Sequence, residues 1–135
     1  MLTTSRPIPD VVGAVCEGLI AQTHYYRGAQ VPGAIVLFLQ LRRRGWQRIF
    51  IEADIVFWHA VDGPDAPGQH DRHHTAVVDV AVTHGHTGKR MLEVVVVDLP
   101  AGGEVHLRFE GAADVVLRKT SEASALLVGG VQTAP

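Results

Sequence analysis

Apolar and polar residues alternate along this chain over short stretches that glycine and proline separate. Alternation with a period of two is typical of β-strands, whose side chains point to opposite faces in turn. It recurs in seven stretches, residues 34–42, 46–61, 75–83, 90–99, 105–110, 114–119 and 125–128. This spacing predicts an all-β fold, which we expect to be an antiparallel β-sandwich, jelly roll or small barrel of about seven or eight strands. The connections are too short for the crossovers of a regular βαβ series.

The stretch from Val11 to Gln22 allows two interpretations. Its apolar residues lie at helical spacing, and Asp10 is a suitable helix N-cap. Gly13 and Gly18, however, would each cost about 1 kcal/mol inside a helix. We therefore favour a strand, with one short N-terminal helix as the alternative.

Apolar residues occupy both faces of several predicted strands. In the stretch 46–61, one face holds Ile49, Ile51, Ala53, Ile55 and Phe57, and we expect it to face the core. The surplus lies on the strand Ala34–Leu41, on the strand Met91–Leu99, and on the face that holds Phe50, Val56 and Trp58. One sandwich interior cannot cover all of these faces, so we expect a homo-oligomer. A cavity for an apolar ligand is the alternative.

The overall totals fit one domain of 135 residues, in which residues 1–9 and 129–135 are expected to be loose tails. The net charge of −2 gives no basic excess, so we expect neither nucleic acid nor an anionic membrane as a partner. The apolar runs are too short for a membrane helix, and the first ten residues do not form a signal peptide. Cys16, the single cysteine, is interpreted as a buried, inert thiol. The cytoplasm is the expected location.

Eight histidines are the most unusual feature of the composition. His84 and His86 would point to the same side of an extended chain, and Glu93 or His106 would complete a divalent metal site. The same pattern also fits histidines of a solvated turn. His70, His73 and His74 lie in a polar loop, where neighbouring imidazoles would act as a mild pH sensor.

A run of arginines suggests a different ligand. Arg42, Arg43 and Arg44, with Arg48 nearby, predict a site for an anion or a nucleotide. Charged residues at a hairpin tip also protect a sheet against aggregation, which is the alternative interpretation.

Catalytic motifs are weak. There is no GxSxG motif, and the carboxylates Glu52 and Asp54 have the character of solvated strand residues. The leading hypothesis is therefore a non-enzymatic β-sandwich module that self-associates and binds a protein partner or a small molecule, with no cofactor. A metal-dependent enzyme of barrel type, using His84 and His86 with Glu93 or His106, and an anion binder using Arg42–Arg44 are the alternatives.

Overall fold

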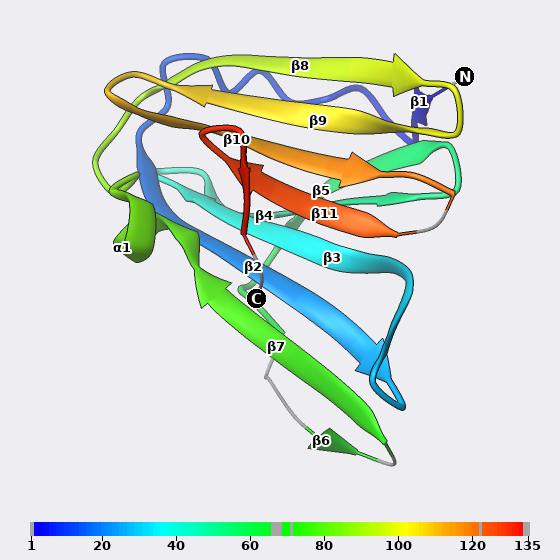
Figure 1. The fold of residues 1–135 in the computed structure, drawn as a ribbon. Coiled ribbons are helices and arrows are strands. Elements are labelled where there is room, and N and C mark those ends of the chain that lie inside the picture. The colour runs from blue at the N-terminus through cyan, green and yellow to red at the C-terminus, as the bar shows by residue number, and fades with distance from the viewer. Residues whose placement is uncertain (1, 66–68, 71, 122, 134–135) are drawn as a thin grey trace.

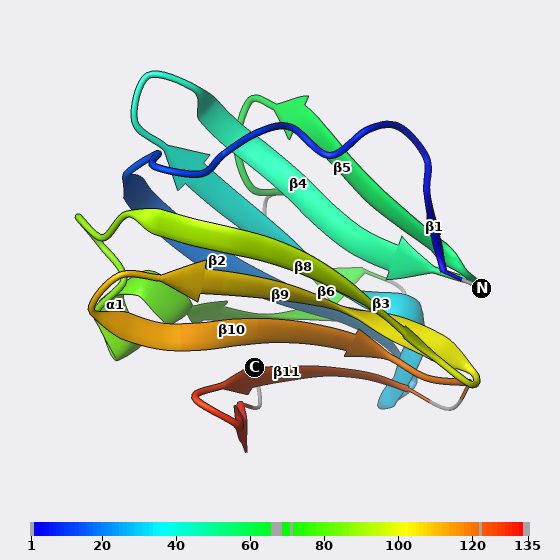
Figure 2. The same ribbon diagram turned by 90° about the horizontal axis from the view of Figure 1, so that it is seen from above.

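The computed structural model describes residues 2–65, 69–70, 72–121 and 123–133, and it consists of two packed β-sheets (Figures 1 and 2). Strands account for 65% of the chain and helix for 4%, which confirms the predicted all-β class. The sandwich is therefore the correct one of the predicted architectures. Among the described residues, no helix is long and apolar enough to cross a membrane.

The larger sheet has seven strands in the order β1-β5-β4-β3-β2-β7-β6. Their bounds are β1 Thr3–Thr4, β2 Cys16–Tyr26, β3 Ala29–Leu41, β4 Gly45–Glu52, β5 Ile55–Val61, β6 Gln69–His70 and β7 His73–Asp79. Neighbouring strands are antiparallel except β1 and β5, which run parallel. β3 occupies the centre of this sheet.

The smaller sheet has five antiparallel strands in the order β12-β11-β10-β9-β8. Their bounds are β8 Met91–Leu99, β9 Gly102–Phe109, β10 Ala112–Lys119, β11 Ser124–Val128 and β12 Val131–Gln132. β8 lies at one edge of this sheet. Both ends of the chain contribute strands where loose tails were expected, because Thr3–Thr4 pairs with β5 and Val131–Gln132 pairs with β11.

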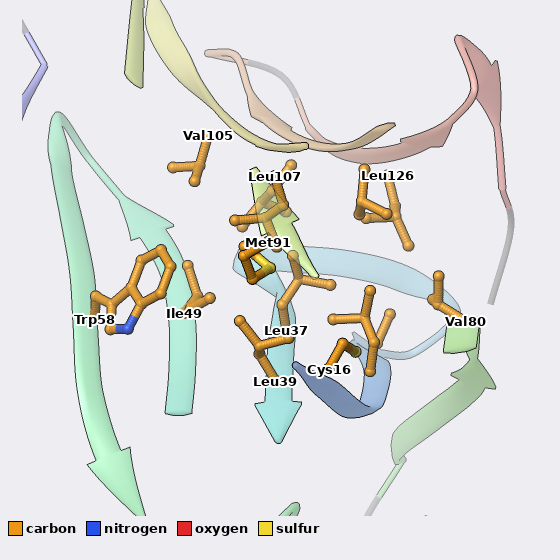
Figure 3. Packing of buried hydrophobic residues seen from close by; sticks show 14 of the residues in the cluster. Cys16, Leu37, Leu39, Ile49, Trp58, Val80, Met91, Val105, Leu107 and Leu126 are labelled. Atoms are coloured by element: carbon orange, nitrogen blue, oxygen red, sulfur yellow. The ribbon is translucent and has the colours of Figure 1, made fainter. Parts of the chain in front are cut away.

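The core fills the space between the two sheets (Figure 3). Leu37 and Leu39 of β3 and Ile49 of β4 point from the larger sheet toward Leu107 and Leu126 of the smaller one, and all five are fully buried. Each such side chain stabilises the fold by about 1.5–3 kcal/mol relative to exposure. The alternation of β3 thus places one full face in the core.

The outer face of β3 is also covered, and the cover comes from the same chain. Val36 and Phe38 point away from the core because they alternate with the core residues, yet they are 2% and 0% exposed. The chain beyond β5 reaches this face, where the carbonyl oxygen of Asp65 accepts a hydrogen bond from Gln22 Nε2 at 2.7 Å. Gln22 pairs with Val36 in the sheet. The apolar surplus of this strand therefore needs no second subunit.

The prediction of one strand from residue 46 to residue 61 is wrong. Glu52 pairs with Ile55, so Ala53 and Asp54 form a two-residue turn between β4 and β5. A turn reverses the strand and shifts the alternation beyond it. The inner face of this hairpin consequently holds the buried residues Gln47, Ile49, Ile51, Val56 and Trp58, whereas Ile55 is exposed. Glu52 and Asp54 do not share a strand face.

The described helix is not at the N-terminus, and the predicted strand 75–83 ends early. β2 covers most of the ambiguous stretch 11–22, which confirms a strand there from Cys16 onward. α1, Val80–His84, instead follows β7. Asp79 caps it by accepting a hydrogen bond from Val82 N at 3.0 Å, and Gly85 ends it with φ 80°. The alternating residues Val80 and Val82 predicted a strand here, but the caps at Asp79 and Gly85 favour a helix.

The turn at Ala53 generates a stability prediction. Ala53 has φ 51°, a left-handed conformation that costs a residue with a Cβ about 1–2 kcal/mol. We expect Ala53→Gly to raise the free energy of unfolding by about 0.5–1 kcal/mol, since glycine removes this cost but loses more chain entropy. Chemical denaturation measures the change. Ala60→Gly, in an exposed position within β5, is the matched control and should lower stability; a destabilised Ala53→Gly would contradict the prediction.

Candidate functional site

The three consecutive arginines occupy the turn between β3 and β4. Leu41 pairs with Gly45, so Arg42, Arg43 and Arg44 form the loop, which a hydrogen bond from Arg44 N to Leu41 O closes at 3.0 Å. Arg43 and Gly45 have φ values of 65° and 76°. Left-handed residues of this kind are typical of short hairpin loops that end in glycine. The sequence therefore predicts this turn correctly.

A hollow of about 500 Å³ opens beside the arginine turn. Its lining residues are Val12, Gly13, Ala14, Val15, Arg42, Arg43 and Arg44. The amide of Arg42 donates to Val15 O at 2.9 Å, which ties the turn to the segment that enters β2. The arginines thus form one wall of a concave site, and the backbone around Gly13 forms the other. We refer to this site as the arginine hollow.

Arg48 is not part of the arginine hollow. It lies further along β4 on the outer face of the larger sheet, with its guanidinium carbon 4.4 Å from the centre of the Phe50 ring. Phe50 stacks on Phe57 at 4.7 Å, and His59 pairs with Arg48 across the strands. Burial, followed by the charges of Arg48 and Arg6, lowers the pKa of His59. This second surface is aromatic and cationic.

His84 and His86 do not form an extended pair. His84 ends α1 and Gly85 is left-handed, so the two rings lie at 64° with centres 6.5 Å apart. His86 is fully buried with its ring against Phe109, so its interpretation as a solvated turn residue is wrong. Its Nε2 lies 2.7 Å from Ala113 O and must donate to that carbonyl. Nδ1 is buried and has no partner among the described residues.

The two residues that were predicted to complete a metal site contact other groups. Glu93 accepts a hydrogen bond from Arg108 at 2.9 Å, and His106 Nε2 lies 2.9 Å from Glu104. In the part of the chain that the structure describes, no three His, Cys, Asp or Glu side chains are placed to hold one metal ion. His84, His86, Glu93 and His106 are therefore not brought together here.

The polar histidine loop becomes part of a sheet. His73 and His74 pair in register with Tyr26 and Tyr25, and each imidazole lies against the tyrosine ring opposite. Both histidines are exposed. The side chain of His70 lies outside the described part of the structure. Of the three histidines in the predicted pH sensor, the structure therefore describes the side chains of His73 and His74.

A network on the outer face of the smaller sheet was not found from the sequence. Glu104 accepts hydrogen bonds from His106 on its own strand and from Arg118 on the neighbouring strand β10. Its side chain is only 10% exposed. The alternation of polar residues in β9 indicates an outer face, but the pairing register that brings Arg118 opposite Glu104 is a tertiary feature.

This network shifts the ionisation of Glu104. Burial raises the pKa of a carboxyl group, but here the hydrogen bonds and charges of His106 and Arg118 outweigh burial and hold the pKa of Glu104 below its usual value. Because a carboxylate only accepts, His106 carries its proton on Nε2. Glu104 therefore stays ionised at neutral pH, with both oxygens occupied.

Apolar residues surround this network. Val95, Val116 and Leu127 lie in one row with His106, and Val97 lies in the next row with Glu104. All four apolar side chains are half-buried, and Leu92 beside them on the edge strand is 43% exposed. The outer face of the smaller sheet thus combines satisfied charges with partly exposed apolar groups.

The fold and these surfaces define the protein as a β-sandwich with an arginine-lined hollow at one end. Comparison with protein-family models, with curated proteins and with solved structures gives no match in any of the three. Any function must therefore be argued from the geometry itself.

Cys16 is buried at the start of β2, as the sequence suggested (Figure 3). Burial is the main cause that raises the pKa of its thiol to about 11, and its Sγ contacts Gly18 O at 3.5 Å. A thiol needs its ionised form to attack or to bind a metal. The environment of Cys16 therefore suppresses both.

We expect Cys16 in the native protein to react with dithionitrobenzoate at least about 100-fold more slowly than in denaturant, because of its raised pKa and its burial. Absorbance against time measures the rate. Glutathione in the same buffers corrects for the effect of denaturant on the reagent. Equal rates in the native and unfolded protein would show that this thiol is accessible.

Glu104 generates a prediction about pH. A lowered folded-state pKa contributes stability that is present above the ordinary carboxyl pKa and is lost as the pH falls through the lowered value. We expect Glu104→Gln to lower the free energy of unfolding by about 1–2 kcal/mol at neutral pH and by less in acid. Denaturation of both proteins across the acidic range measures this. Glu110→Gln, on an exposed residue, should change little at any pH; a pH-independent loss in Glu104→Gln would exclude the proposed role of its charge.

Proposed function

We propose that this protein is a non-enzymatic binding module that self-associates through the outer face of its smaller sheet. The observation that carries the proposal is the group of half-buried apolar residues around the Glu104 network, Val95, Val97, Val116 and Leu127. Apolar groups of this kind gain by further burial against a partner.

The position of the surface supports this choice. Of the three apolar surpluses expected from the sequence, β3 is covered by its own chain, and Val56 and Trp58 turn into the core. Phe50 stays half-buried on the outer face of the larger sheet, where it contacts Phe57 and Arg48. The strand Met91–Leu99 remains. It forms an edge of the smaller sheet. Its first residue, Met91, exchanges backbone hydrogen bonds with Gly13 and Ala14, and Val95 and Val97 lie beyond that contact.

The charges of this face favour a second copy of the same chain as the partner. Arg118 lies against Glu104, and Arg108 lies between Glu93 and Asp114 at 2.9 and 3.7 Å. Two arginines are thus paired with three carboxylates within the face, so a partner need not supply a large excess of either sign. A two-fold symmetric contact, in which the same patch meets itself, satisfies this condition.

The size of the face is also suitable. A stable interface buries about 800 Å² on each partner, roughly a ninth of the 7177 Å² that the chain exposes. The strands β8 to β10 have eight or nine residues each, and β11 has five. The four strands cover about 25 Å by 20 Å as a flat surface. The accessible area of this face is larger, because side chains project from it. Most of the outer face would therefore take part.

We expect the purified protein to form a dimer of twice 14.6 kDa at about 100 µM. Replacing Val95 and Val116 together by lysine should weaken the association at least about tenfold, because two charges would be buried against the partner. Sedimentation velocity over a range of concentrations measures both.

Val77→Lys is the matched control, because Val77 is 42% exposed on β7 of the other sheet and should leave the dimer unchanged. Thermal unfolding verifies that each variant folds, and Val116→Thr, which keeps the β-branched shape, replaces the lysine variant if that one unfolds. A wild-type monomer at the highest concentration, or a dimer that only Val77→Lys disrupts, would overturn the proposal.

A further inference from the structure

The turn between β3 and β4 meets the segment that enters β2 at one end of the sandwich (Figure 2). The arginine hollow is lined by this turn and this segment. Several charged residues lie at this end. The segment is hydrogen-bonded to Lys89 through Cys16 N at 2.8 Å, and Val15 forms a bridge with Arg90. These are backbone contacts, and the side chain of Lys89 lies toward Gly111, outside the lining of the hollow.

Acidic residues lie at this end as well. Glu17 lies 3.5 Å from Arg42, and Asp10 turns its carboxylate to Val12 N at 3.2 Å while its carbonyl oxygen accepts from Arg44. Glu110 is hydrogen-bonded through its amide to Arg90. Asp79 also acts electrostatically on Cys16, and Asp62 directly follows Val61, which pairs with Trp46. Acids therefore balance the cations around this end, and the positive charge is concentrated in the lining of the hollow, which holds three arginines.

The three guanidinium groups differ in their freedom. Arg42 is paired with Glu17, and Arg44 donates a hydrogen bond to the carbonyl oxygen of Asp10. Arg43 makes no hydrogen bond or ion pair within the described part of the chain, and its donors are available. Two partnered guanidinium groups beside a free one suit oxyanions, which arginine binds through paired N–H donors.

The lining also limits what the ligand contains. The other lining residues, Val12 to Val15, are small or aliphatic, and the described residues of the wall include neither an aromatic ring nor an acidic group. A nucleobase would therefore find no stacking partner. A volume of about 500 Å³ lies within the range of small-molecule sites and is too small for a folded partner.

We propose that the arginine hollow binds a compact multivalent oxyanion, a small polyphosphate or polycarboxylate, and recognises its charge and not an attached base. This site is independent of the outer face of the smaller sheet. Its ligand is held by Arg43, with Arg42 and Arg44 closing the rim.

Isothermal titration calorimetry with pyrophosphate, tripolyphosphate and citrate at low salt tests the proposal. At least one of the three should bind with one-to-one stoichiometry and lose affinity as salt rises. Tighter binding of pyrophosphate than of citrate would identify a polyphosphate as the ligand, and the reverse would identify a polycarboxylate. Adenosine triphosphate should bind within roughly twofold of tripolyphosphate, since the base makes no contact.

Arg43→Ala should weaken binding about tenfold, and Arg43→Lys should restore only part of it because lysine lacks the paired donors. Arg27→Ala, which removes an exposed arginine at the far hairpin of β2 and β3, is the charge-matched control and should bind as the wild type does. Circular dichroism confirms folding of each variant. No binding of any of the three anions, equal losses in Arg43→Ala and Arg27→Ala, or a nucleotide preferred tenfold over tripolyphosphate would overturn the proposal.

Discussion

The need to bury both faces of β3 organises this molecule. Its inner residues fill the core, and its outer residues Val36 and Phe38 are equally buried. Two layers must therefore lie over one strand. The smaller sheet provides the inner layer, and the chain beyond β5 contributes to the outer one, where Gly63 lies beside Trp46 and Asp65 is bonded to Gln22. The hydrophobic effect drives both, since any uncovered face of β3 would expose its large side chains.

This arrangement distributes the remaining surfaces. Because the smaller sheet covers the inner side of β3 with one face, its own outer face is left to the solvent or to a partner. If this sheet only covered the core, its outer face could be fully polar. Valines and the nearly buried carboxylate of Glu104 lie there instead. Because the strands of the larger sheet are long, the turns between them lie at the ends of the sandwich. One such turn, with Arg42 to Arg44, meets the segment around Gly13 and encloses a hollow there.

Local patterns predicted much of the fold, and they failed where a local signal was absent or was overridden. Alternation identified the strands β8 to β11 of the smaller sheet, because half-buried strands repeat with a period of two, but it missed β12 in the expected C-terminal tail. It gave no sign of the turn at Ala53, where an alanine takes a left-handed conformation that usually marks glycine. Similarly, the valines beyond Asp79 resemble a strand, although Asp79 and Gly85 cap a short helix there.

The sequence by itself determined the all-β class, the turn at the arginines and the burial of Cys16, since each depends on the character of neighbouring residues. Only the tertiary structure decided which residues meet across strands. It separated Arg48 from the other arginines, buried His86 against Phe109, and joined Glu104 to Arg118. The physical reason is that strand pairing and sheet packing set these contacts through register, and register depends on turns and on partners distant in the chain.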